Sequence, residues 1–112
     1  MQKIFTKTPL GTSALEAIVP PMNIGNLRQK TLVFVNAADG AALADVNVEV
    51  GPTATGPWEE ISLGSTGIAT LAAGASATLR FTQLDEYMQV RAQAAVVPDH
   101  HCDLTLYVNL DE

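Results

Sequence analysis

Residues 44–50 read ADVNVEV, and this strict alternation of apolar and polar side chains restricts the fold more than any other feature of the chain. The three valines fall on one side of an extended backbone, and the acidic and amide side chains fall on the other. A helix would scatter the valines around its circumference. The segment therefore predicts a β-strand with one face in a core.

Several other segments carry the same signal. Residues 75–82, 86–94 and 102–110 also alternate, and residues 58–63 and 67–71 are shorter candidates. Residues 30–36 instead form a continuous apolar run rich in β-branched side chains, which is typical of a central strand covered on both faces. Turn-forming glycine and proline residues separate the segments.

This spacing predicts an all-β protein, a single antiparallel β-sandwich of seven to eight strands with an extended N-terminal segment. Both an immunoglobulin-like and a jelly-roll order remain open. The expected core consists of Val33, Val35, Val46, Val48, Val50, Leu79, Phe81, Val90, Leu104, Leu106 and Val108. Residues 13–19 are either a short helix or an extended arm, because Ser13 and Glu16 have the spacing of a capping box but Pro20 and Pro21 follow.

The length of 112 residues suits one domain. We expect residues 30–112 to form the sandwich body and residues 1–29 to form an N-terminal arm or edge-strand segment. The arm combines chain breakers with many apolar side chains, so it must lie against its own body, a neighbouring subunit or a larger surface. Its start lacks the apolar stretch of a signal peptide, so we expect no export.

The formal net charge of −6 disfavours a nucleic-acid partner, whose affinity comes from neutralised phosphates. No apolar run approaches the length of about 20 residues that a membrane span needs, so we expect no membrane partner.

The densest group of reactive side chains is DHHCD at residues 99–103. The remainder of the chain has no other Cys or His to complete a metal shell. Neighbours on a strand also do not aim at each other as a nucleophile and its base must. We therefore expect no metal, no cofactor and no enzymatic activity, and we expect Cys102 to be a half-buried residue at the start of a strand.

A candidate contact surface comes from the last two strands, which usually pair in a sandwich. Their adjoining outer faces would be polar, nearly uncharged and rich in Tyr and Arg, which are enriched in interfaces; the alternative is an ordinary solvated sheet face. With the basic N-terminal arm, the predicted interface residues are Lys3, Phe5, Lys7, Tyr87, Gln89, Arg91, Tyr107 and Asn109.

Three stretches carry a resemblance to a known class of proteins. They are residues 46–61 (VNVEVGPTATGPWEEI), residues 71–81 (LAAGASATLRF) and the pair YMQVRA at 87–92 and LTLYV at 104–108. Together they resemble small β-sandwich virion proteins of tailed bacteriophages, especially capsid decoration or cement proteins.

The resemblance implies a non-enzymatic virion structural protein that is assembled in the host cytoplasm and binds the outside of a capsid. Its partners would be the major capsid protein and further copies of itself, as a dimer or a trimer. The alternative is a carbohydrate- or surface-binding module of a tail fibre or other adhesive protein.

Overall fold

The structure, a computed structural model, describes residues 2–25, 29–38, 40–63, 66–82 and 86–111. The strands are β1 (Gln2–Leu10), β2 (Glu16–Asn23), β3 (Gln29–Asn36), β4 (Leu43–Gly51), β5 (Glu59–Glu60), β6 (Ser76–Phe81), β7 (Tyr87–Ala94) and β8 (Cys102–Asp111). A single 3-10 turn, η1 (Ile68–Thr70), is the helical element of this part of the chain.

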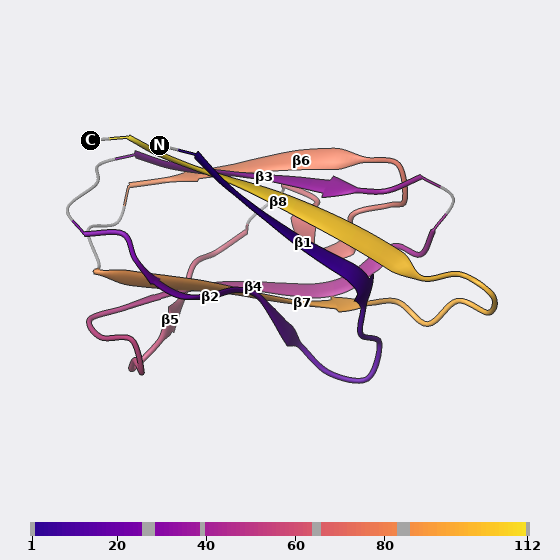
Figure 1. Ribbon diagram of the computed structural model, residues 1–112, viewed down its shortest axis with the longest axis horizontal. Coiled ribbons are helices and arrows are strands. Elements are labelled where there is room, and N and C mark those ends of the chain that lie inside the picture. The colour runs from indigo at the N-terminus through magenta and orange to yellow at the C-terminus, as the bar shows by residue number, and fades with distance from the viewer. Residues whose placement is uncertain (1, 26–28, 39, 64–65, 83–85, 112) are drawn as a thin grey trace.

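The strands form two antiparallel sheets packed face to face, in the orders β1-β8-β3-β6 and β2-β7-β4-β5 (Figure 1). The antiparallel pairs β1–β8, β2–β7, β3–β6 and β4–β5 are those of one long hairpin rolled into two layers. The predicted β-sandwich is thus confirmed. Of the two orders left open, this pairing is that of the jelly roll, in which consecutive strands mostly alternate between the sheets.

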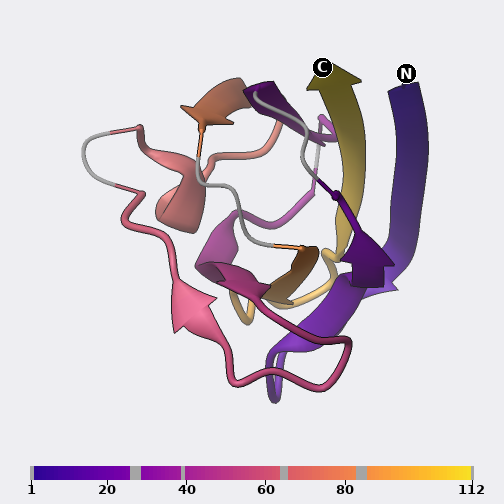
Figure 2. The same cartoon turned by 90° about the vertical axis from the view of Figure 1, so that its left-hand side faces the viewer.

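The N-terminal segment supplies one edge strand to each sheet. β1 lies beside β8, so the first and last strands of the chain are neighbours (Figure 2), and β2 lies beside β7. The extended alternative for residues 13–19 is therefore the right one from Glu16 onward. Lys7 Nζ lies 3.1 Å from Glu16 Oε2 and joins the two edges.

The predicted core is correct except on one strand. Nine of the eleven expected core residues are buried, but Val33 and Val35 are only half-buried. On β3 the buried apolar side chains are Leu32 and Phe34, which pair with Val108 and Leu106. A continuous apolar run does not show which of its faces points inward, and the other sheet covers only one face of β3. The expectation of cover on both faces is wrong.

Two local expectations also fail. The candidate strand at residues 67–71 instead contains the 3-10 turn η1, Ile68–Thr70, which begins after Gly67, whose φ of 75° is left-handed. The last two strands do not pair: β7 lies between β2 and β4, whereas β8 lies between β1 and β3 in the other sheet. The link of residues 95–101 crosses from one layer to the other, as jelly-roll connections do.

Candidate functional site

The structure divides the predicted interface residues among three places. Tyr107 and Asn109 lie on the outer side of the β1-β8-β3-β6 sheet, and Tyr87, Gln89 and Arg91 lie on the outer side of the other sheet. The third group, Lys3, Phe5 and Lys7, takes the inward positions of β1, opposite the buried residues Val108, Leu106 and Leu104. The single surface expected from the sequence does not exist, because β7 and β8 belong to different layers.

On the outer side of the first sheet, three rows of side chains cross all four strands, and we call these rows the Tyr107 face. Asp103 takes the adjoining outward position of β8, next to the row that contains Thr105. In strand order β1, β8, β3, β6, the rows are Gln2–Asn109–Thr31–Arg80, Ile4–Tyr107–Val33–Thr78 and Thr6–Thr105–Val35–Ser76.

Every side chain in these rows is exposed or half-buried. Arg80, at the β6 edge, is the one charged residue of the three rows. Ile4 is 59% exposed, and Val33 and Val35 occupy the middle of the face on β3. Tyr107 stands between Ile4 and Val33. The Tyr107 face is thus a broad surface of hydroxyl, aliphatic and aromatic groups, and charged side chains are depleted at its centre as they are in interface cores.

The outer side of the second sheet has a different chemistry, and we call it the Glu49 face. Glu49 is 9% exposed, and its Oε1 accepts hydrogen bonds from Arg91 Nε at 2.8 Å and from Gln89 Nε2 at 3.1 Å. With its amide reoriented, Asn47 donates to Glu60 Oε1 at 3.2 Å. These polar groups largely satisfy one another, so this face is a hydrogen-bonded network with acidic character.

An aromatic pair borders this network. Gly51 pairs with Tyr87, and a Cβ on Gly51 would lie 3.2 Å from Trp58 Cε3, so the indole packs over this glycine. Trp58 and Tyr87 are both half-buried. The cluster places two ring systems beside amide, guanidinium and carboxylate groups.

A shallow cavity of about 260 Å³ lies between two segments of the chain. Its lining residues are Asp99, His100, His101 and Asp103 from one segment and Ala37, Ala38 and Gly40 from the other. His101 Nε2 lies 3.2 Å from Asp103 Oδ2. Among the described residues, no group of three or more His, Cys, Asp or Glu side chains is placed to hold a metal ion.

Cys102 is fully buried, so the expectation of half-burial is wrong. Its thiol donates to Asn36 Oδ1 at 3.3 Å. Burial raises the pKa of this thiol, and the neighbouring charge of Asp103 raises it further. A buried thiol with a raised pKa is a poor nucleophile, because the thiolate is the reactive form.

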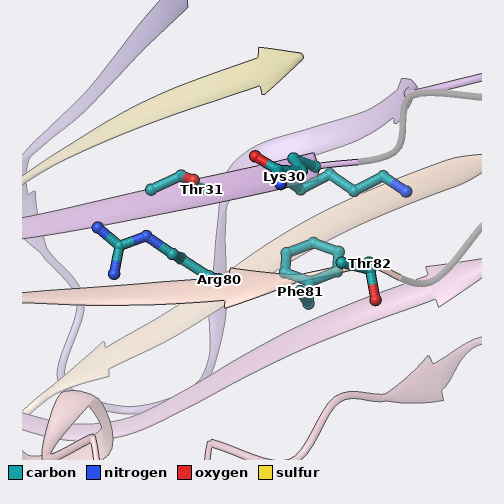
Figure 3. A pocket seen from close by; sticks show the side chains of 6 residues that line it. Lys30, Thr31, Arg80, Phe81 and Thr82 are labelled. Atoms are coloured by element: carbon teal, nitrogen blue, oxygen red, sulfur yellow. The ribbon is translucent and has the colours of Figure 1, made fainter. Parts of the chain in front are cut away.

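A second cavity, of about 300 Å³, lies where β3 begins and β6 ends. Lys30 is fully buried there, with its Nζ 5.9 Å from the centre of the Phe81 ring. Figure 3 shows the Lys30 ammonium and the Arg80 guanidinium pointing away from each other, because they belong to opposite faces of the sheet. The two cations therefore do not converge on one ligand.

Sequence reasoning missed Asn36, Lys30 and Ile4. Lys30 and Asn36 are the polar residues at the two ends of an apolar run. Exposed residues often occupy such positions, and only the pairing of β3 with its neighbouring strands shows that these two are buried. Ile4 sits in a segment whose partner strand is more than a hundred residues away in the chain. Its exposure depends on that pairing, and no local pattern marks it.

In the part of the chain that the structure describes, no helix has the length and apolarity that a membrane span requires. A comparison with protein-family models finds none that matches the chain. A comparison with curated proteins likewise finds no match.

Proposed function

We propose that this chain is a non-enzymatic virion structural protein that binds the outside of a bacteriophage capsid through its Tyr107 face. The observation that carries the proposal is the composition of that face: three complete cross-strand rows hold a single charge, on a chain with twelve acidic residues. A decoration protein needs one face that loses water on contact and another that stays hydrated. The Tyr107 face and the Glu49 face suit these two tasks.

The distribution of charge between the two faces supports an orientation in which the Tyr107 face contacts the capsid and the Glu49 face points to solvent. Asp45, Glu49 and Glu60 lie on the Glu49 face, where Arg91 is the counter-charge. Turning this side to solvent keeps like charges of neighbouring copies in water, where they are screened. Turning the Tyr107 face to the shell buries aliphatic and aromatic groups at little desolvation cost. The partner is the folded surface of the major capsid protein.

The test is co-sedimentation of the purified protein with capsids, assembled without it, of the phage that encodes it. In Ile4→Glu/Thr78→Glu, two carboxylates flank Tyr107 and Val33 in the central row. We expect at least a tenfold loss of affinity, since each charge must be desolvated on docking.

The matched control is Ala17→Glu/Asn47→Glu, which adds the same charge to the other sheet at outward positions that both pair with Arg91. It should bind as the unmodified protein does. Equal binding by both variants, or no sedimentation of the unmodified protein, contradicts the proposal.

A second candidate is a carbohydrate- or surface-binding module, and the aromatic pair on the Glu49 face favours it. Sugar rings stack on aromatic side chains while amide and carboxylate groups bind their hydroxyls. This function predicts that neutral oligosaccharides shift the tryptophan fluorescence of Trp58 and that Tyr87→Ala abolishes the shift. An unchanged spectrum across a glycan panel excludes this candidate.

A further inference from the structure

Strand β1 has fewer buried residues than the other long strands of the sandwich. Leu10 is its single buried residue, whereas four residues are buried on β3 and four on β7. Its inward positions carry Lys3 and Lys7 on either side of Phe5, which is half-buried against the core. Apolar burial therefore contributes little to the attachment of this strand.

The attachment instead rests on the ladder with β8. Seven residue pairs align the two strands, from Gln2 opposite Asn109 to Leu10 opposite Cys102. Main-chain ladders of this kind accept any strand of suitable register. The strand that fits β8 best in both register and side chains is β1 itself, and every further copy of this chain carries it.

The charges of the chain favour the same pairing. Residues 1–10 carry Lys3 and Lys7 and no acid, a net charge of +2, whereas the remaining residues carry four basic against twelve acidic residues, a net of −8. Each β1 is thus attracted to any body, while two bodies repel each other. Lys7 pairs with Glu16 at 3.1 Å within one copy, and the same ion pair re-forms when β1 comes from a second copy.

The place where β1 can swing away is also defined. The register with β8 shifts between Lys7 and Leu10, which interrupts the ladder. Immediately beyond, Gly11 O accepts from Ala94 N at 2.9 Å and Thr12 O accepts from Gln93 Nε2 at 2.8 Å, so the chain there stays with β7. The pivot is confined to residues 8 and 9, because Leu10 is buried and pairs with Cys102.

We infer that two copies of this chain exchange residues 2–7 of β1, so that these residues of each copy pair with β8 of the other in the register seen within one copy. Such an exchange keeps the ladder of residues 2–7 with β8 and makes a closed dimer. The inferred exchange does not depend on the proposed binding of the Tyr107 face to a capsid, since the Tyr107 face has the same composition with and without the exchange.

The test uses Ile4→Cys/Tyr107→Cys in the full chain with Cys102→Ser, because Ile4 and Tyr107 are direct cross-strand neighbours. The control is Val33→Cys/Thr78→Cys in the same background, a neighbour pair on β3 and β6 within one body. Both proteins are oxidised and run on a denaturing gel without reductant, and the linked peptides are identified by mass spectrometry.

Exchange predicts a covalent dimer for the first protein, joined between position 4 of one copy and position 107 of the other, and a monomer for the control. A monomer with positions 4 and 107 linked within one chain overturns the inference. So does a dimer linked through two equivalent positions, 4 to 4 or 107 to 107, and so does the absence of any disulfide under conditions in which the control closes.

Discussion

Asn36 shows how one buried polar side chain holds several parts of the fold together. It is 1% exposed, and its Nδ2 donates to Ala41 O at 3.0 Å and to Leu71 O at 3.1 Å, while its Oδ1 accepts from the Cys102 thiol. It thereby ties β3 to β8 and to two connecting segments. The residue is a hydrogen-bond junction rather than a ligand site.

We expect Asn36→Ala to lower the free energy of unfolding by at least about 2 kcal/mol, since each buried group left without its partner costs about 1–3 kcal/mol. Chemical denaturation monitored by Trp58 fluorescence measures the loss. Asn109→Ala, at a half-buried position on the Tyr107 face, serves as the control and should change stability by less than about 0.5 kcal/mol. Equal effects of the two changes contradict the role of Asn36.

Cys102 gives the stability a defined pH dependence. The pKa of its thiol is raised in the folded chain above the ordinary value of 9.0, so the unfolded chain loses this proton first as the pH rises. Above pH 9 the thiol therefore costs stability, by up to about 1.4 kcal/mol per pH unit, until the folded thiol ionises too. Below pH 9 it has no such effect.

The measurement is the difference in unfolding free energy between the unmodified protein and Cys102→Ser, taken from pH 7 to pH 10.5. Serine keeps a donor for Asn36 but does not ionise in this range. The difference should be constant up to about pH 9 and then shift against the unmodified protein. A difference that stays constant throughout shows that the folded thiol ionises as readily as the unfolded one.

Among the elements, β8 is a central strand of its sheet. It pairs on both sides, with β1 and β3, and its inward residues from Cys102 to Leu110 are all buried. Leu106 lies at its centre and is fully buried. We expect Leu106→Ala to cost about 2–5 kcal/mol in unfolding free energy. A loss below about 0.5 kcal/mol, measured by thermal or chemical unfolding, means that the side chain is not in the core.

The strands themselves were largely predictable, because alternation is a local pattern. It identified β4, β7 and β8 and correctly assigned the inward side chains of each. It failed on β3, where Leu32 to Val35 are all apolar and the inward face is chosen by the neighbouring strands. It also could not show that β7 and β8 lie in different sheets, because strand pairing depends on the whole topology.

The candidate site was less predictable for the same reason. Tyr107 and Asn109 were identified by residue type, but their partners on the Tyr107 face come from β1, β3 and β6, which are distant in the chain. Tyr87 and Arg91 were identified by the same criterion, but they lie on the outer side of the other sheet. Residue type can identify candidate interface residues, whereas only the order of the strands in the sheets shows which of these residues lie on the same surface.

At the scale of the whole molecule, the jelly roll presents two sheets of unlike chemistry to opposite sides. The Tyr107 face carries one charge in its three rows, and the Glu49 face carries a hydrogen-bonded acidic network. Jelly rolls serve in both viral capsids and lectins, so the fold alone does not choose between the two candidate functions. The choice rests on which face meets a partner.

The two tyrosines answer that question directly, because the chain has just these two and they lie on opposite faces. Hydroxyl-radical footprinting of the protein, free and bound to capsids of the phage that encodes it, reports the solvent access of each ring. Docking through the Tyr107 face predicts that oxidation of Tyr107 falls at least fivefold on binding, while oxidation of Tyr87 is unchanged. Protection of Tyr87 with Tyr107 still accessible would place the contact on the Glu49 face and contradict the account.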